Sequence, residues 1–266
     1  MLYFEKTLRE GCRDWVVVLH GLGGTIESLK FQIREYSNFY NVLAIELPGH
    51  GRSVEEPIPE TYELDSVAAS VVEVMDFCGI EKARFTSVSL GSLVALGVAA
   101  NYPQRVVSLV QCGGILRFEW YMRIFALPAI WASRIFSHVS VYRFFAGLIF
   151  PGRKHWIAQN IFIRGASQMV EKVFYAWIMF MLGRGRRLED YIRKLNSAES
   201  LIPQLYVLGD EDFLFRKSTP RLARKISDAV TVIIENAEHI CNIEQRKEFN
   251  RISLEFFATQ GKPTNA

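Results

Sequence analysis

Short apolar runs alternate along the chain with stretches in which apolar residues recur at helical spacing. The runs are nearly continuous in apolar residues, as expected of strands that are covered on both faces. They predict strands at Trp15–Leu19, Asn41–Leu47, Ala83–Ser87, Val106–Gln111, Leu205–Gly209 and Val230–Ile234. Helical patterns between them cover Glu27–Ser37, Leu64–Cys78, Leu90–Asn101, Arg216–Ile226 and Cys241–Phe257. This order predicts right-handed crossovers and an α/β fold with a doubly wound, mostly parallel sheet.

Two segments depart from the alternation. We expect Leu2–Arg9 to form an antiparallel edge hairpin that leads into Trp15, with its turn near Glu10 and Gly11. Residues 117–200 contain no convincing strand and are helical, aromatic and basic. They hold 13 Arg and Lys against 5 Asp and Glu, a net charge of +8, and 17 of the 34 aromatic residues. We therefore expect a helical cap at 117–200, called the insertion below, within a core formed by 1–116 and 201–266.

The composition is that of one large folded domain. Half of the 266 residues are hydrophobic, and no Pro-rich or Gly/Ser-rich linker interrupts them. A net charge of +3 gives little support to nucleic-acid binding. The first residues lack a secretory-signal pattern, and no uncharged apolar run of 18 residues predicts a transmembrane segment. The four cysteines show no CxxC spacing, so we expect reduced thiols and a cytoplasmic location.

A serine stands where a predicted strand gives way to a predicted helix, in the segment Ser87-Val88-Ser89-Leu90-Gly91. A residue on so sharp a turn takes a strained backbone, and its neighbours two before and two after must be small. Ser87 and Gly91 meet that requirement. The turn would expose the Ser89 hydroxyl and place the backbone N–H of Leu90 at a helix start, where it can stabilise an oxyanion.

A glycine-rich loop follows the strand Trp15–Leu19 and reads His20-Gly21-Leu22-Gly23-Gly24. The glycines let the backbone turn closely over the end of the sheet, so the N–H of Leu22 could supply a second oxyanion donor. Such a loop could instead bind a phosphate. It lacks the GxGxxG spacing and any GK[ST], which makes phosphate binding the weaker interpretation.

A nucleophilic serine needs a base and an orienting carboxylate. Of the five histidines, His239 stands alone in the loop between the last strand and the last helix. In an open parallel sheet, ligands bind at the carboxyl ends of the strands, where such loops converge. The strand Leu205–Gly209 ends in Asp210-Glu211-Asp212, which makes this acidic turn the source of the carboxylate.

These motifs together resemble the α/β-hydrolase superfamily. The residues that carry the resemblance are HGLGG at 20–24, ELPGHGRS at 46–53, SVSLGS at 87–92, GDED at 209–212 and EHICNIE at 238–244. The resemblance implies an eight-stranded sheet with a helical cap inserted after the sixth strand. It also implies Ser89 as nucleophile, His239 as base and the N–H groups of Leu22 and Leu90 as the oxyanion hole. The superfamily's Gly-x-x-Asp pattern favours Asp212 over Asp210 as the acid.

Five positions in these motifs are either structural in the superfamily or differ from its usual residues. His50 and Arg52 match a turn that in the superfamily is mostly structural. Ser87 replaces a more usual glycine, and Glu46 stands where aspartate is commoner. Glu238 replaces the glycine that often precedes the histidine. Its carboxylate could raise the pKa of His239 or simply face solvent.

The motifs predict a cofactor-independent serine hydrolase that acts on a carboxylic ester, with the insertion lining an apolar acyl pocket. We find no His/Asp/Glu cluster at ligand spacing and therefore expect no metal. The basic insertion, densest at Arg184, Arg186 and Arg187, could recruit an acidic carrier protein or an anionic lipid surface. The alternatives are a C–C bond hydrolase or lyase on the same fold, and a non-catalytic ligand receptor. A haloalkane dehalogenase is disfavoured, because its nucleophile would be an aspartate where Ser89 stands.

Overall fold

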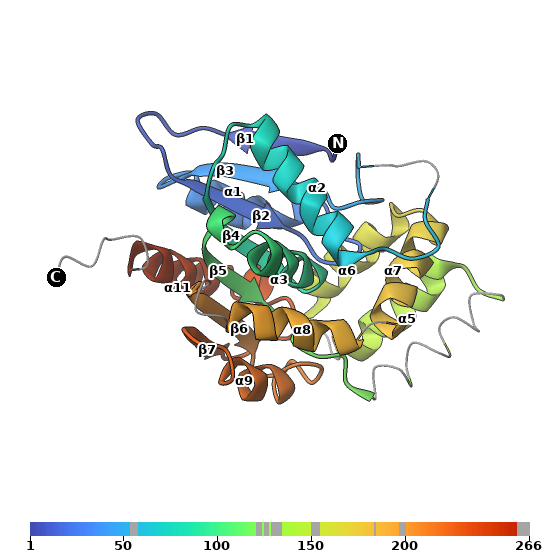
Figure 1. Cartoon of the computed structure of the whole chain (residues 1–266). Helices are drawn as coiled ribbons and strands as arrows, with labels where there is room; N and C mark the ends of the chain where they lie inside the picture. The colour runs from blue at the N-terminus through green and yellow to red at the C-terminus, as the bar shows by residue number, and fades with distance from the viewer. Residues whose placement is uncertain are drawn as a thin grey trace.

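The predicted apolar runs form one sheet at the centre of the molecule (Figure 1). The computed structural model describes residues 1–53, 58–120, 124, 128, 135–149, 155–183, 185–196 and 201–259. Its strands are β1 (Phe4–Thr7), β2 (Trp15–Leu19), β3 (Asn41–Ile45), β4 (Ala83–Val88), β5 (Val106–Cys112), β6 (Gln204–Gly209) and β7 (Ala229–Ile234). They lie in the order β1-β3-β2-β4-β5-β6-β7, and all neighbours except β1 and β3 are parallel. The doubly wound, mostly parallel sheet is therefore confirmed.

Two details of the predicted sheet are wrong. β1 is an antiparallel edge strand, but it pairs with β3, with Phe4 opposite Ile45, and forms no hairpin with β2. The reason is that parallel partners, β3 and β4, occupy both sides of β2. The described residues form seven strands and not the expected eight, so the insertion follows the fifth strand, β5, and not the sixth.

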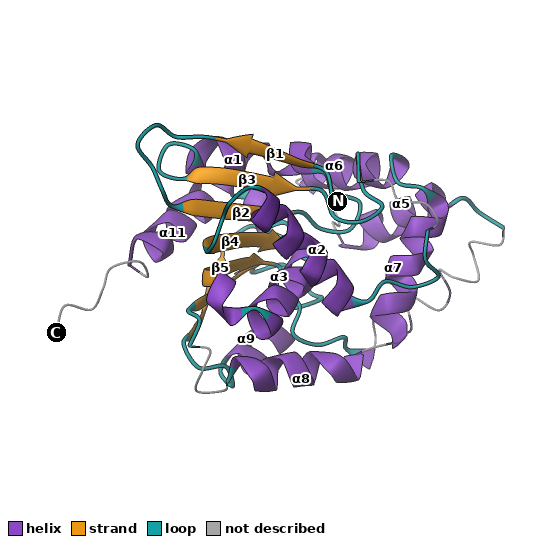
Figure 2. Cartoon of the chain, turned by 45° about the horizontal axis from the view of Figure 1, so that its top comes forward, coloured by secondary structure: helices purple, strands orange, loops and turns teal. Residues whose placement is uncertain are grey.

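Helices cover both faces of the sheet (Figure 2). On one face lie α2 (Leu64–Phe77) and α3 (Leu90–Asn101), whose apolar side chains share a buried cluster with β2 and β4. On the other face lie α1 (Lys30–Tyr36) and α11 (Arg246–Thr259), which belong to a second buried cluster. The remaining short helices of the core are η1 (Ile26–Leu29), η2 (Pro103–Arg105), α9 (Ser218–Ala223) and α10 (Cys241–Glu244).

The predicted helix Cys241–Phe257 is interrupted in the structure. Its first turn is α10, and the backbone of Gln245 then leaves the helical region at φ −115° and ψ 46° before α11 begins. The break lets the two pieces pack differently: α10 contacts helix α6 (Trp156–Ser167) of the insertion, whereas α11 lies against α1.

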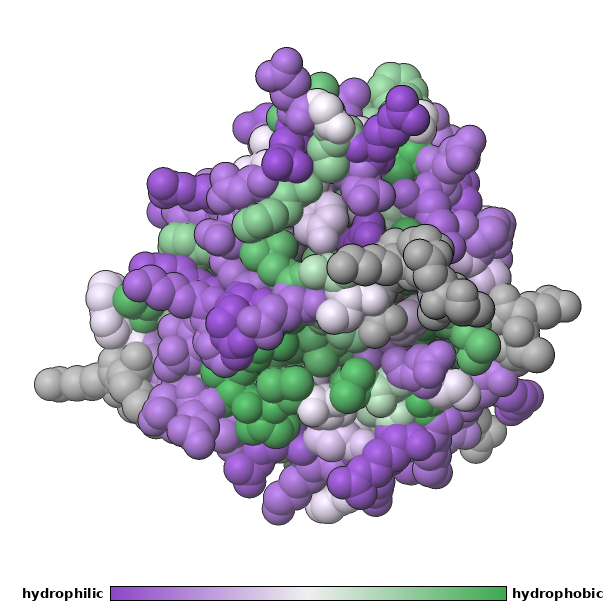
Figure 3. Space-filling view, turned by 90° about the vertical axis from the view of Figure 1, so that its left-hand side faces the viewer, coloured by the Kyte–Doolittle hydropathy of each residue, from purple (hydrophilic) through white to green (hydrophobic). Residues whose placement is uncertain are grey.

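The described part of the insertion contains four helices, and no strand occurs there. They are α5 (His138–Ile149), α6 (Trp156–Ser167), α7 (Glu171–Gly183) and α8 (Gly185–Leu195). The first three lie beyond the end toward which the parallel strands point (Figure 2), while α8 packs on α3. Among the described residues, no helix combines the length and apolar character needed to cross a bilayer. The face seen in Figure 3 is mostly hydrophilic, with one contiguous apolar area.

Candidate active site

Ser89 occupies a strained turn between β4 and α3. Its backbone has φ 48° and ψ −110°, a conformation that costs a non-glycine residue on the order of 1–3 kcal/mol. The turn is held because the Ser89 N–H donates to the carbonyl of Cys112 over 2.9 Å. A side chain at Gly91 would place its Cβ 2.6 Å from the carbonyl oxygen of His20. The small residue predicted at that position is therefore required by the contact between α3 and the end of β2.

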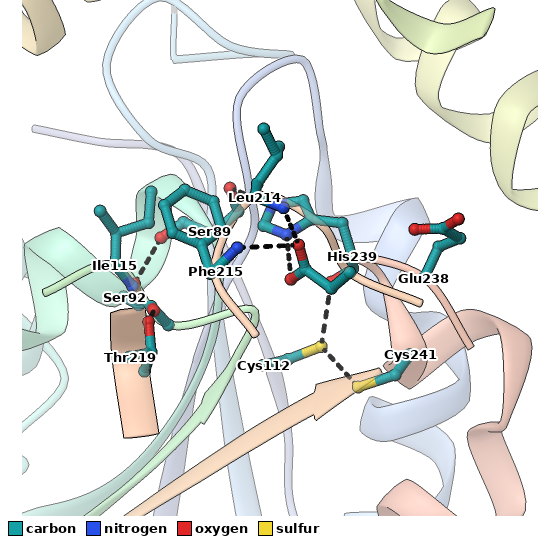
Figure 4. A network of polar contacts seen from close by, with 12 residues as sticks. Ser89, Ser92, Cys112, Ile115, Leu214, Phe215, Thr219, Glu238, His239 and Cys241 are labelled. Atoms are coloured by element: carbon teal, nitrogen blue, oxygen red, sulfur yellow. Dashed lines mark hydrogen bonds and ion pairs between the residues drawn. The ribbon is translucent and has the colours of Figure 1, made fainter. Parts of the chain in front are cut away.

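The structure brings Ser89, His239 and Asp212 together in one hydrogen-bonded line, although they come from three separate loops. Figure 4 shows Ser89 and His239 of this line. The Ser89 Oγ lies 2.8 Å from His239 Nε2, and His239 Nδ1 lies 3.0 Å from Asp212 Oδ2. The tautomer that satisfies both bonds has the proton on Nδ1. His239 and Asp212 are 4% and 1% exposed, so the line is screened from bulk water except at the serine.

The carboxylate of Asp212 is oriented from its own loop. Its Oδ1 accepts hydrogen bonds from the N–H groups of Leu214 and Phe215 over 3.0 and 3.1 Å, which leaves Oδ2 for the histidine. Asp210 has a different task, because its Oδ1 accepts the N–H of Ala237. Sequence reasoning missed Gly113, where an added Cβ would lie 2.7 Å from His239 Cε1.

The backbone amides of Leu22 and Leu90, the predicted oxyanion donors, belong to the glycine loop and to the start of α3. Neither N–H has a hydrogen-bond partner among the described residues. The glycine loop passes close to the nucleophile turn, since a Cβ at Gly21 would lie 3.3 Å from the Cβ of Ser89. Amides without a partner in this region are available to bind a developing negative charge, so the oxyanion hole stays a prediction.

Two buried histidines hold the glycine loop. His50 Nε2 accepts the N–H of Gly23 over 3.1 Å, and His20 Nε2 accepts the N–H of Leu47 over 3.0 Å. Burial, together with the charge of His50, lowers the pKa of His20 to about 3. Burial lowers the pKa of His50 to about 4. Both rings are therefore neutral at pH 7, and each can accept a hydrogen bond from a backbone N–H. The sequence predicted a structural position for His50 but did not specify this acceptor role.

Helices of the insertion contact the same loop. The Tyr142 hydroxyl of α5 donates to the carbonyl of Leu22 over 2.6 Å, and Gly165 of α6 crosses so close that a Cβ there would overlap the carbonyl of Gly23. Apolar side chains of Leu214 and Phe215 lie beside the Ser89–His239 pair (Figure 4). Arg184 and the side chains of Arg186 and Arg187 lie outside the described residues, so an acidic partner stays a prediction.

Glu238 does not face solvent. It is 2% exposed, and its carboxylate points away from the Ser89–His239 pair (Figure 4). It lies in a group with His155 and Glu211, whose potential ligand atoms are within 4.8 Å of one another. Burial raises the pKa of the Glu238 carboxyl to about 7. Spacing along the sequence did not reveal this group, because 56 positions separate His155 from Glu211 and 27 positions separate Glu211 from Glu238.

Comparisons with known proteins agree with this architecture. Over 245 residues the chain is 25% identical to the dihydrolipoyllysine-residue acetyltransferase component of the acetoin cleaving system of Pseudomonas putida, covering 91% of this chain. It spans only 62% of that relative's length. It is 26% identical to the 2-hydroxy-6-oxononadienedioate/2-hydroxy-6-oxononatrienedioate hydrolase of Burkholderia vietnamiensis, covering 91% of this chain and 86% of the relative.

A solved structure and a family model extend the agreement to the fold. An alpha/beta hydrolase enzyme from a Medee basin deep-sea metagenome library superposes with a TM-score of 0.82 at 19% identity, covering 100% of this chain and 97% of that one. The model of the alpha/beta hydrolase fold matches residues 14–245, which include Ser89, Asp212 and His239. The chain therefore belongs to the alpha/beta hydrolase fold family.

Proposed function

We propose that the chain is a serine hydrolase that cleaves a carboxylic ester, thioester or lactone with an apolar acyl group. One observation carries the proposal: Ser89 Oγ, the His239 ring and Asp212 Oδ2 form a continuous hydrogen-bonded line of 2.8 and 3.0 Å. This is the arrangement in which a base activates a nucleophile and a carboxylate orients that base. The apolar side chains of Leu214 and Phe215 next to the line support an apolar acyl group.

In the first half-reaction the Ser89 oxygen attacks the carbonyl carbon while His239 Nε2 takes the hydroxyl proton. The imidazolium that forms is stabilised by Asp212. The carbonyl oxygen becomes an oxyanion that the N–H groups of Leu22 and Leu90 bind, and such a donor typically contributes about 10²–10³ in rate. His239 then returns the proton to the leaving alcohol or thiol as the carbonyl–oxygen or carbonyl–sulfur bond breaks.

In the second half-reaction water attacks the acyl-enzyme. His239 accepts a proton from that water, and the tetrahedral intermediate collapses to release the carboxylic acid. His239 gives its proton back to the Ser89 oxygen, which restores the starting state. The insertion, with Tyr142 on the carbonyl of Leu22, would hold the oxyanion loop during both steps.

A second candidate is the hydrolysis of a carbon–carbon bond in a dicarbonyl-like acid. The name of the Burkholderia vietnamiensis relative describes a hydroxy-oxo dienedioate, which is a substrate of that chemical type. The two candidate reactions are separated by measuring hydrolysis of p-nitrophenyl esters of graded acyl length and, in parallel, cleavage of vinylogous diketones. Only ester cleavage through an acyl-enzyme gives a burst of p-nitrophenol equal to the enzyme concentration.

The nucleophile is tested with a fluorophosphonate probe, which labels activated serines. We expect labelling of the native chain, no labelling of Ser89→Ala, and unchanged labelling of Ser66→Ala, an exposed serine on α2. Circular dichroism confirms that each variant is folded. Persistent labelling of folded Ser89→Ala would refute the nucleophile, and a native chain that binds ligands without labelling would favour a receptor.

A further inference from the structure

A second polar group lies behind the proposed catalytic line and is not used by it. It consists of four residues: His155 just before α6, Glu211 after β6, Glu238 before α10, and Glu244, the last residue of α10. His155 and Glu238 are 3% and 2% exposed. The group thus joins the insertion to the two loops that carry Asp212 and His239.

The histidine of this group is oriented as a metal ligand would be. Its Nδ1 is hydrogen-bonded to Glu244 Oε1, and the other oxygen of Glu244 accepts the N–H of Glu238 over 2.6 Å. A carboxylate on one ring nitrogen fixes the tautomer and directs the lone pair of the other nitrogen outward. That nitrogen, Nε2, lies 3.1 Å from Glu211 Oε2. With the proton on Nδ1, a lone pair and a carboxylate oxygen face each other, and either a second proton on the ring or a bound cation between them makes this contact favourable.

The carboxylate of Glu238 completes the group. Its Oε2 is buried and has no hydrogen-bond partner among the described residues, which is costly for a polar atom. Within the residues that the structure describes, no Lys or Arg forms an ion pair with Glu238 or Glu244. When both are ionised, the carboxylates of Glu238 and Glu244 carry one negative charge more than a protonated His155 balances. Buried charge of this kind is expected to be paired or to coordinate a metal.

We propose that His155 Nε2 and the carboxylates of Glu211 and Glu238 bind one Zn²⁺ ion, with Glu244 as the hydrogen-bond partner that orients His155. One imidazole and two carboxylates are a zinc-type donor set. Ligand atoms about 2.1 Å from a tetrahedral ion lie about 3.4 Å apart, so the present separations of up to 4.8 Å close with small side-chain movements. Water fills the fourth position. Binding displaces any proton held on His155 or Glu238 and involves no change of oxidation state.

The ion has a positioning role and stays clear of the reacting atoms. Glu211 directly precedes Asp212, and Glu238 directly precedes His239. Because the ion would tie both loops to His155 of the insertion, it fixes the acid and the base relative to each other. Its binding does not require that Ser89 be a nucleophile, so the site is testable in a Ser89→Ala background.

Zn²⁺ binding by the full chain provides the test, after stripping with a chelator. We expect one Zn²⁺ per chain by calorimetry and by competition with a chromophoric chelator, and an increase in Tm on addition of Zn²⁺. Glu238→Gln should weaken binding at least about tenfold and abolish the Tm increase. Glu235→Gln, an exposed position on the same loop, is the matched control and should bind as the native chain does.

Two further measurements keep the proposal open to refutation. Co²⁺ in place of Zn²⁺ should give the visible bands of a four-coordinate site, and these bands should be lost in His155→Gln. Binding without one-to-one stoichiometry, or equal affinity of folded Glu238→Gln and Glu235→Gln, would overturn the site. A native chain that binds no Zn²⁺ would show that the group is only an ion pair of His155 with Glu211 and Glu244.

Discussion

At the scale of single residues, the two aspartates after β6 show how much depends on which atom points where. They are two positions apart in one turn, yet only Asp212 directs an oxygen to His239, at 3.0 Å. Its other oxygen is held by two backbone amides. Asp210 accepts the N–H of Ala237 and so closes the neighbouring loop. Acidity alone therefore does not identify the orienting carboxylate.

Asp212→Asn should lower kcat for a p-nitrophenyl ester about 10⁴-fold with little loss of fold. The amide cannot stabilise an imidazolium, and it favours the wrong tautomer of His239. Steady-state kinetics on folded protein measure the effect. Asp210→Asn is the matched control and should retain kcat within about tenfold, because its contact is with a backbone amide. Comparable losses in the two variants would mean that the turn, and not the Asp212 oxygen, is what matters.

The sequence could predict this line but not the residues that support it. Ser89, His239 and the acidic turn each follow a predicted strand, and strand ends meet at one edge of a parallel sheet. The acceptor role of His50 toward Gly23 depends on a contact between two loops 27 positions apart. Glu238 is buried near His155, which precedes α6 in the insertion. No local pattern reports such contacts.

At the scale of elements, burial on both faces made β2 to β6 predictable, whereas the edge strand β7 was predicted from its apolar run although most of its residues are partly or fully exposed. The apolar run at Trp15–Leu19 has the bounds of β2 itself, and the others differ from the predicted bounds by one or two residues at an end. Pairing was less predictable, because β1 is short, mostly exposed and next to β3 rather than to its sequence neighbour. The break at Gln245 was not predicted, since it arises from the separate packing of α10 and α11.

The contact between α3 and the end of β2 should tolerate no side chain at Gly91. Gly91→Ala would place Cβ within 2.7 Å of the carbonyl oxygens of Leu19 and His20, which are backbone atoms that cannot move away easily. We expect a loss of about 1–3 kcal/mol in the free energy of unfolding, measured by urea denaturation. Because the glycine loop begins there, the proposed ester hydrolysis should fall as well.

Gly147→Ala is the matched control for this substitution. Gly147 lies inside α5, and the nearest atom to an added Cβ is Gln159 Nε2 at 3.9 Å. Alanine in such a helical position should stabilise the fold by about 0.5–1 kcal/mol. The two variants should therefore shift the urea midpoint in opposite directions. Similar shifts in both would argue against a tight crossing at Gly91.

At the scale of the whole molecule, buried titratable groups link the active-site loops to the stability of the fold. His20 and His50 lie with ring centroids 4.9 Å apart under the glycine loop, and both are completely buried. Helices α5 and α6 of the insertion contact the same loop through Tyr142 and Gly165. Protonation of His50 would therefore break its hydrogen bond with the N–H of Gly23, and protonation of His20 would break its hydrogen bond with the N–H of Leu47. Both bonds hold the loop that carries Leu22.

These histidines should make the fold sensitive to mild acid. Their pKa values are about 3 and about 4 in the folded state, below the ordinary value of 6.5, so the unfolded chain takes up protons first. The contribution of the two neutral histidines to the free energy of unfolding is fully present above pH 6.5. It is lost as the pH falls toward 4, by up to about 1.4 kcal/mol per pH unit for each histidine. The raised pKa of Glu238 gives a slope of opposite sign between about 4.5 and 7.

Because that opposing slope is common to both proteins, His50→Gln is compared with the native chain at each pH. Glutamine can still accept the N–H of Gly23 but cannot take up a proton. At pH 8, where His50 is neutral, the free energies of unfolding of the two proteins differ only through packing. That difference is the baseline for the comparison. Between pH 6.5 and 4.5 the unfolding free energy of the variant should fall less steeply, by about 1.4 kcal/mol per pH unit at most. Parallel curves over this range would mean that His50 titrates normally in the folded protein, and hence that the glycine loop opens to water.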